Sequence, residues 1–398
     1  MDSNKISYFS WLYLIAWCIS PPLAYGTLYR GLAILSILII IIYSLKTYVP
    51  NLRNRFLQCV LLCFYIFVIC FFTGDPYVGK IGVFVILLTS TSFALWNHSY
   101  GNNIRQLHFL ILFALSLYCI WNTTTLLALV EEERLMRMLV QNSDISEICA
   151  QNGIGGYGYL YSVIAMLPIG ISMMGIKQNI IFRIIVFYFV ISGFILSYMS
   201  QYFMGLLLAI LIIPMMYVAH KNQGTVSVRS YIIIFGLVFL IFYNLELILE
   251  YLIDVVDLSS VNHKLVEMQD ALINGEDVED TEFGDRYLRY ARDLNLILQS
   301  PIFGVFNYTK VGKHSSILDF FAQYGIPLGI VYVKIIFSSC LDWIRMKIPV
   351  ASVVLWVIFI ISIMNVLPLS AAVPLCIALP AYCKMSWLKS QSSIILAS

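Results

Sequence analysis

Three arginines and one histidine are the residues of this sequence best placed to do chemistry. Arg286, Arg289 and Arg292 recur at every third position of the stretch GDRYLRYARDLNLILQ, which ends a long polar segment. A guanidinium group donates two parallel hydrogen bonds to a phosphate, so a row of them suits an anionic lipid headgroup. His314 follows at the start of the next hydrophobic segment, with these cations nearby. The stretch is therefore a candidate site for a phosphorylated lipid.

The element that must present these arginines is predicted to be an amphipathic helix. At 3.6 residues per turn, the arginines and Asp293 fall on one side. Pro301 ends the helix, and Gly304 and Gly312 mark a loop. Two interpretations stay open: a specific headgroup site, or a solvated face drawn to lipid phosphates at the interface. The opposite, apolar stripe consists of Tyr287, Ala291, Leu294 and Leu298.

Other charged residues lie where they could serve the same site. Asp319 is near the outer end of a hydrophobic segment, where it would orient His314, bind a sugar hydroxyl or simply be interfacial. Arg134 and Arg137 follow an acidic run in EEERLMRMLVQNSDISEICAQNG, which is long enough for a short amphipathic helix. Either these arginines pair with the acids in solvent, or they reach the site of the second loop.

Composition sets the class of protein. Of 398 residues, 60% are hydrophobic and 12% are charged, and the mean hydropathy is +0.86, as in a polytopic membrane protein. The net charge of +2 argues against a nucleic-acid partner. No metal or cofactor is expected, because zinc, EF-hand and Walker-type spacings are missing from the sequence. Most of the nine cysteines lie in apolar segments, whereas Cys149 lies in a polar loop.

The predicted fold is an all-α polytopic membrane protein with about twelve transmembrane helices of ~20 residues each. It forms a single transmembrane domain, 1–398, with two larger outer loops, 129–153 and 251–316, that carry amphipathic helices. The predicted spans are 8–25, 28–45, 56–73, 78–96, 107–127, 154–175, 180–198, 201–219, 231–250, 317–340, 350–366 and 370–387.

The distribution of basic residues predicts the orientation. Cytoplasmic loops carry an excess of lysine and arginine. With both termini in the cytoplasm, the short outer connections carry almost no basic residues, and both larger loops face outward. The inner loops then contain Lys46, Arg53, Arg55, Arg105, Lys177, Lys221, Arg229, Arg345 and Lys347.

The stretch GDRYLRYARDLNLILQSPIFGVFNYTKVGKHSSILDFFAQYGIPLGI resembles the signature of the O-antigen polymerase and ligase superfamily, and the twelve-span layout with a large outer loop agrees with it. Three departures stand out. Asp285 separates Gly284 from Arg286, Ser315 stands where asparagine is common, and SQYFMG has Tyr202 near the place of a family arginine. The matching positions are Gly284, Arg286, Pro301, Gly304, His314, Ser315, Leu318, Tyr324, Gly325 and Gly329.

The resemblance implies glycosyl transfer at the periplasmic face of the bacterial inner membrane. The donor would be a glycan on undecaprenyl diphosphate, and the acceptor a hydroxyl of the next lipid-linked repeat unit. Arg286 would stabilise the departing diphosphate, assisted by Arg289, Arg292 or, in place of the missing arginine, Arg134 or Arg137. His314 would take the acceptor proton, since the unperturbed pKa of histidine, about 6.5, is near working pH.

Three alternatives to a polymerase share parts of this evidence. A ligase that transfers finished glycan to lipid A–core has the same signature, although the Tyr- and Phe-rich spans favour the polymerase. A flippase or transporter for the lipid-linked sugar would show internal repeats or broken, charged helices in mid-membrane. A noncatalytic scaffold leaves the arginines and His314 unexplained. Membrane lipids are the expected surroundings, and a chain-length-determining co-polymerase is a further partner by family analogy.

Overall fold

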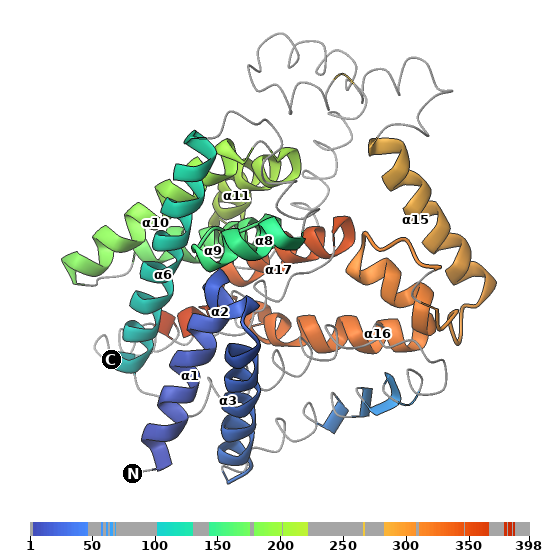
Figure 1. Ribbon diagram of the computed structural model, residues 1–398, viewed down its shortest axis with the longest axis horizontal. Helices are drawn as coiled ribbons and strands as arrows, with labels where there is room; N and C mark the ends of the chain where they lie inside the picture. Colours follow the sequence, from blue (N-terminus) through green and yellow to red (C-terminus); the bar gives the residue numbers. More distant parts are fainter. Residues whose placement is uncertain are drawn as a thin grey trace.

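A computed structural model of the protein describes residues 3–46, 102–129, 143–175, 179–200, 202–221, 282–307, 310–345 and 347–365, with isolated positions in 57–68, 266 and 378–386. Every regular element within these residues is a helix (Figure 1). A helix satisfies its backbone hydrogen bonds internally, which is what a lipid environment requires. The helices are α1 (Ser3–Ile19), α2 (Pro21–Tyr25), α3 (Thr27–Lys46), α6 (Asn102–Leu129), α8 (Ser143–Gln151), α9 (Tyr157–Met174), α10 (Ile180–Met199), α11 (Phe203–Lys221), α15 (Glu282–Gln299), α16 (Ser316–Arg345) and α17 (Pro349–Met364).

Five of these helices are long and apolar enough to cross a membrane. This confirms the prediction of an α-helical membrane protein. Each coincides with a predicted span, and shorter apolar helices also match the predicted spans 28–45 and 350–366. The predicted spans 56–73, 78–96, 231–250 and 370–387 lie outside the described residues, isolated positions excepted. The five long segments are Gln106–Leu129, Tyr157–Met174, Ile180–Met199, Met204–Lys221 and Ser316–Lys334.

The first predicted span, 8–25, is divided in the structure. α1 ends at Ile19, Ser20 is extended, and α2 begins at Pro21. Proline lacks an N–H and its ring clashes with the preceding turn, so it is accommodated as the first residue of a new helix. The prediction from hydropathy used only the length of the apolar segment. It therefore missed the division into two helices at Pro21 and Pro22.

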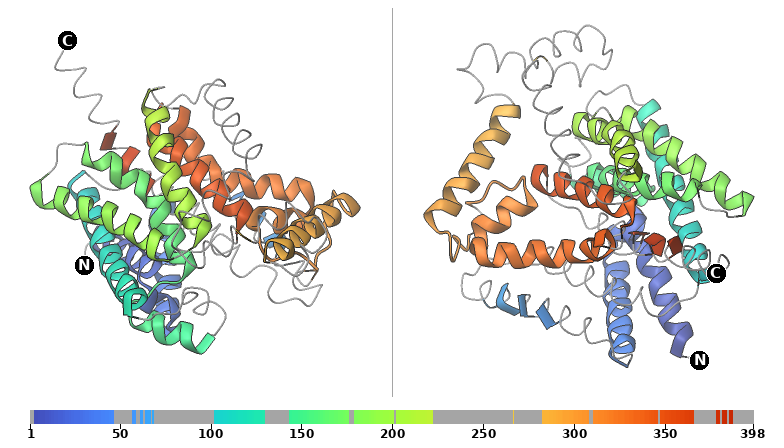
Figure 2. Two further views of the ribbon diagram at one scale, coloured as in Figure 1. Left: turned by 90° about the horizontal axis from the view of Figure 1, so that it is seen from above. Right: turned by 180° about the vertical axis from the view of Figure 1, so that it is seen from behind.

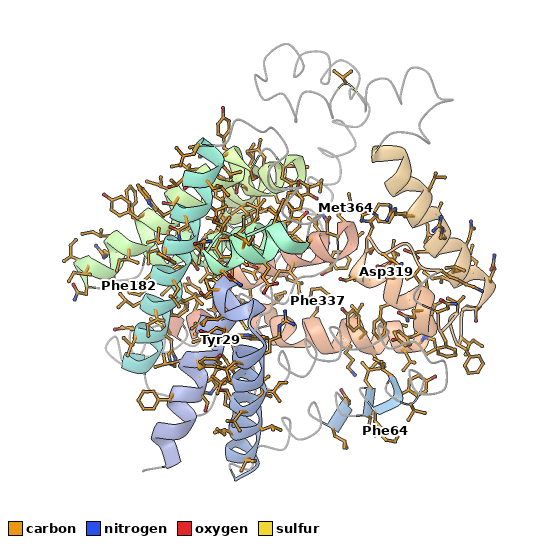
Figure 3. All side chains as sticks on the ribbon, viewed as in Figure 1. Tyr29, Phe64, Phe182, Asp319, Phe337 and Met364 are labelled. Atoms are coloured by element: carbon orange, nitrogen blue, oxygen red, sulfur yellow. The ribbon has the colours of Figure 1, made fainter. Side chains whose placement is uncertain are left out.

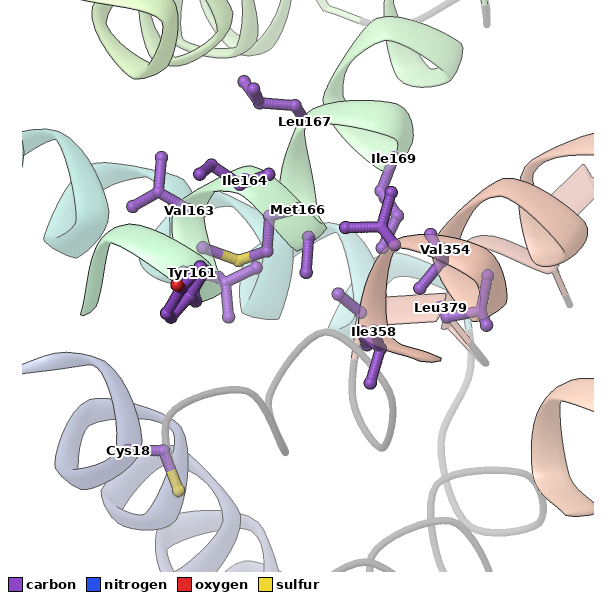
Figure 4. Close-up of a cluster of buried hydrophobic side chains, with 14 of the residues drawn as sticks. Cys18, Tyr161, Val163, Ile164, Met166, Leu167, Ile169, Val354, Ile358 and Leu379 are labelled. Carbon is purple, nitrogen blue, oxygen red and sulfur yellow. The ribbon is translucent and has the colours of Figure 1, made fainter. Parts of the chain in front are cut away.

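The core is built around α9. Nearly all of its side chains are buried, and α9 packs against α10, α11 and α17. Figure 4 shows Ile169 of α9 on the side that faces Val354 of α17. Gly193 of α10 lies so close to α9 that a Cβ there would come within 2.8 Å of Leu167. Small residues permit this close approach, as is common between helices in membranes.

α15 and α16 form a separate corner of the molecule. α15 packs along α16, α16 packs on α17, and the corner lies away from α1, α6 and α10 (Figures 1 and 2). Through α17 it is tied to the central helix α9. α17 therefore connects the candidate site to the core.

The first predicted outer loop, 129–153, contains the helix α8. Cys149 on α8 is half-buried, whereas Cys18, Cys119 and Cys383 are buried. Burial raises the pKa of the Cys149 thiol above its ordinary value. Cys149 thus combines access to solvent with a thiol that is mostly protonated at neutral pH.

This cysteine provides a test of the predicted orientation. We expect a membrane-impermeant maleimide to label Cys149 in cells whose outer membrane alone is permeabilised. Because only the thiolate reacts and the pKa is raised, the rate should rise about tenfold per pH unit between neutral pH and pH 9. Cys149→Ser is the control for the other cysteines. Labelling that requires rupture of the inner membrane would place this loop in the cytoplasm.

Candidate functional site

Asp293, on the polar side of α15, faces the protein. Asp293 is fully buried and Arg289 is half-buried, whereas Leu294 is 50% and Leu298 is 78% exposed. Arg292 is exposed. The predicted amphipathic helix is confirmed, and Leu294 and Leu298 of its apolar stripe face outward, whereas Ala291 is half-buried. That arrangement suits a helix beside lipid, where polar groups gain most by turning towards other polar groups.

α16 is broken at Gly325. Gly325 has φ 80° and ψ 168°, a conformation that only glycine adopts readily. Pro327 has no N–H to donate to the carbonyl of Gln323, four residues earlier. The freed carbonyls of Ala322 and Gln323 instead accept hydrogen bonds from the N–H groups of Val305 and Phe306, each at 3.0 Å.

The turn after α15 fits into this break. The N–H of Ile326 donates to the carbonyl of Pro301 at 2.7 Å. Gly304 has φ 71°, and a Cβ on it would overlap the Gln323 carbonyl. A Cβ on Gly325 would likewise overlap the Ile302 carbonyl. The turn and the kink therefore form one backbone joint that requires both glycines.

The loop before α16 is held by two aspartates. The N–H of Gly312 donates to Asp293 Oδ1 at 2.8 Å, and the N–H of Lys313 donates to Asp319 Oδ1 at 2.9 Å. Ser315 caps α16, because its Oγ accepts from the N–H of Leu318 at 3.0 Å. His314 lies between Lys313 and Ser315 in the chain, and its side chain is half-buried. Figure 3 shows Asp319 where α15 and the beginning of α16 meet.

The end of α17 supports the same region. Tyr290 of α15 donates its hydroxyl to the carbonyl of Met364 at 2.9 Å. The N–H of Ser316 donates to the carbonyl of Asn365 at 3.2 Å, and Ser315 Oγ lies 3.3 Å from the carbonyl of Ser362. α15, α16 and α17 thus meet at one junction next to His314.

A tyrosine pair extends this junction to the core. The Tyr161 hydroxyl donates to the Tyr202 hydroxyl at 2.7 Å, and the Tyr202 hydroxyl donates to Asn365 Oδ1 at 3.2 Å. The ring of Tyr157 lies 4.5 Å from that of Tyr202, measured between centroids. The resemblance noted in the sequence leads to the expectation of an arginine near this position, and this chain has Tyr202 there.

The structure brings together part of the predicted site. The backbone of Arg289, the side chain of Asp319 and the loop that carries His314 meet at one junction, whereas the side chain of Arg292 is exposed. Arg286 lies in α15, but its side chain is outside the described residues, as are Arg134 and Arg137 entirely. Among the described residues no three His, Cys, Asp or Glu side chains gather as metal ligands.

Comparison of the chain with protein-family models, with curated proteins and with solved structures finds no match. The superfamily that the sequence resembles therefore stays a prediction.

Sequence reasoning missed two features of the site. Asp293 was recognised on the polar side of the helix with the arginines, but not as a member of the site. Its signal was its position four residues after Arg289, which is one turn along the same face. Asn365 had no signal in the sequence, since its role depends on where α17 ends.

The residues at or beside the junction include a histidine, an arginine, two aspartates that each hold the loop, and a tyrosine. His314 and Arg289 are both half-buried, which leaves each of them partly accessible. Asp293 and Asp319 are almost completely buried and bind backbone. The accessible groups suit an anionic ligand and a proton transfer, and the buried groups suit structural support.

Proposed function

We propose that the protein is an O-antigen polymerase, a glycosyltransferase that joins undecaprenyl-diphosphate-linked repeat units at the periplasmic face of the bacterial inner membrane. The observation that supports this proposal is that separate parts of the motif, which resembles the superfamily signature, lie close together in the structure. Its separated elements, the 301–304 turn, His314 and Gly325, belong to one joint and one loop that also involve Arg289.

The proposed reaction is a displacement at the anomeric carbon of the donor sugar. The acceptor hydroxyl oxygen forms a bond to that carbon, and the bond from the carbon to the diphosphate oxygen breaks. Undecaprenyl diphosphate leaves with the electron pair. His314 takes the proton of the acceptor hydroxyl, and Arg286 with Arg289 neutralises the charge that develops on the diphosphate. Arginine supplies the charge that a metal ion supplies in other glycosyltransferases.

A transporter of the same lipid is the second candidate, because a transporter would also be expected to have a broken helix such as α16. Discontinuous helices hold substrates at their free backbone groups. Here the carbonyls freed at Gly325 are already occupied by Val305 and Phe306. The break thus serves the joint with the 301–306 turn, and this supports the enzyme over the transporter.

A lipopolysaccharide ladder gel on the source bacterium tests the proposal. Deletion of the gene should collapse the ladder to core plus a single repeat unit, and the wild-type gene should restore it. Loss of every repeat unit, with lipid-linked polymer accumulating, would instead assign the ligase activity. An unchanged ladder in the deletion strain would refute both enzymes.

A further inference from the structure

The helix α15 has three sides that differ in polarity and exposure. On the first side Asp293 is buried against the protein. On the second side Leu294 and Leu298, one turn apart, are exposed. The third side is exposed and mostly polar, and its residues are Leu288, Arg292, Asn295 and Gln299. A helix with a protein side, an apolar side and a polar side is typical of the boundary between lipid and water.

The apolar side continues beyond the end of α15. Ile302 and Phe303, in the turn that follows, are 61% and 65% exposed. The N–H of Ile326 binds this turn to the break in α16 through the carbonyl of Pro301, and Ile326 and Ile330 are exposed after the break. α16 is long and apolar enough to cross a membrane. The α15–α16 apolar surface therefore consists of Leu294, Leu298, Ile302, Phe303, Ile326 and Ile330.

Lys334 indicates how deep this surface lies in a membrane. Lys334 is exposed, and it follows Ile330 and Ile326 at intervals of four residues on the same side of α16. A lysine beside lipid extends its ammonium group to the headgroups. The part of α16 beyond Lys334 is about 17 Å long, which is too short to cross a hydrocarbon core of about 30 Å. The ammonium must therefore reach the headgroups on the side away from His314.

The position of the break follows from that of Lys334. Ile326 precedes Lys334 by only about 12 Å of helix, at 1.5 Å per residue. This distance is much less than the thickness of the hydrocarbon core, about 30 Å. The break, and the turn that is bonded to it, therefore lie inside the hydrocarbon and not at the headgroups on the side of His314.

The backbone at the break is suited to this depth. Irregular backbone is tolerated within a membrane where its polar groups are bonded inside the protein. The carbonyls that the break frees, those of Ala322 and Gln323, accept hydrogen bonds from Val305 and Phe306. In water, solvent would satisfy these carbonyls without any help from the turn. The pairing of the turn with the break is therefore what a lipid environment requires.

We infer that the α15–α16 apolar surface is embedded among the phospholipid acyl chains of the membrane leaflet on the side of His314. The partner is the hydrocarbon of the bilayer, which matches the exposed leucine, isoleucine and phenylalanine side chains. The polar side of α15, with Arg292, then faces the headgroups, whose phosphates attract cationic side chains. The bilayer thus holds α15 in addition to its packing on α16, and this placement is independent of the reaction that the protein catalyses.

Photo-cross-linking in proteoliposomes of phosphatidylethanolamine and phosphatidylglycerol tests the placement. p-Benzoylphenylalanine replaces Phe303 or Leu298 on the apolar surface, and Asn295 or Gln299 on the polar side as matched controls. After irradiation and ester hydrolysis, mass spectrometry detects fatty acids bound to the peptides. We expect about tenfold more fatty-acid adducts at Phe303 and Leu298 than at the two controls, because acyl chains are confined to the hydrocarbon core.

Two results of the cross-linking would overturn the inference. Fatty-acid adducts that are equally rare at all four positions would place the turn in water. Cross-links from Phe303 to a second copy of this chain, in place of lipid, would show that protein covers the surface.

A charge at Phe303 provides a measurement in cells. Phe303→Asp should lower the amount of protein in the membrane severalfold, because an ionised carboxylate is costly in hydrocarbon. Phe303→Leu and Asn295→Asp are the controls and should accumulate like the wild type. The Phe303 side chain is largely exposed, so the loss of its packing on protein contributes little. Equal abundance of Phe303→Asp and Asn295→Asp would contradict the placement in lipid.

Discussion

Gly325→Ala is expected to lower the stability of the folded protein by about 3 kcal/mol or more. Gly325 has φ 80°, which is unfavourable for alanine, and the added Cβ would overlap the Ile302 carbonyl. A backbone carbonyl cannot rotate away as a flexible side chain can. The Ile302 turn would have to move, and with it the hydrogen bonds of Val305 and Phe306 to the broken helix. Thermal unfolding of the purified protein in detergent, followed with its abundance in membranes, measures the effect.

Gly31→Ala provides the matched control. A Cβ at Gly31 in α3 would meet nothing within 4 Å. Alanine is also favoured over glycine in a helix by about 1 kcal/mol. We therefore expect Gly31→Ala to unfold at the wild-type temperature or above it. If Gly325→Ala unfolded at the same temperature as Gly31→Ala, the joint between the turn and the kink would not exist as described.

Gly304, the second glycine of the joint, provides a further test of the contact between the turn and the kink. Gly304→Ala should cost about as much as Gly325→Ala, because its Cβ would overlap the Gln323 carbonyl. The double variant should cost clearly less than the sum, since each single substitution already separates the same two segments. Additive losses would mean that the two glycines serve unrelated purposes.

Local features of the site could be predicted from the sequence because they depend on neighbouring residues. Pro301 ends α15, Gly325 with Pro327 breaks α16, and the repeat of apolar residues defines an amphipathic helix. Each is a property of one backbone segment and its steric limits. The contact between the two glycines could not be predicted, since it depends on the distance between segments that local patterns do not determine.

The sequence also could not predict which face of α15 packs against the rest of the protein. An amphipathic pattern gives two faces, but in a membrane protein an apolar face packs on lipid or on other helices with similar ease. Burial of Asp293 and exposure of Leu298 settle the choice in this structure. The partner of Asp293 was hidden for a related reason, because the N–H of Gly312 comes beside it only once the loop folds back along α15.

His314→Ala is expected to abolish polymerisation while leaving the protein folded. Removal of a general base typically costs about 10²- to 10⁴-fold in rate. His314 is half-buried, and the loop around it is held through backbone N–H groups that alanine retains. In a strain complemented with this variant, the ladder should stop at a single repeat unit, and lipid-linked repeat units should accumulate. Turnover in proteoliposomes measures the same loss directly.

The controls for this experiment distinguish a loss of catalysis from a loss of folding. His220→Ala removes an exposed imidazole at the end of α11, in the predicted cytoplasmic region, and should leave the ladder intact. Unfolding of His314→Ala at the wild-type temperature would separate a lost proton acceptor from a lost fold. A full ladder from His314→Ala would remove the histidine from the reaction even if gene deletion abolished the polymer. The proton would then have to pass to another group of the junction, and Asp319, which lies next to the loop, would be the first to test.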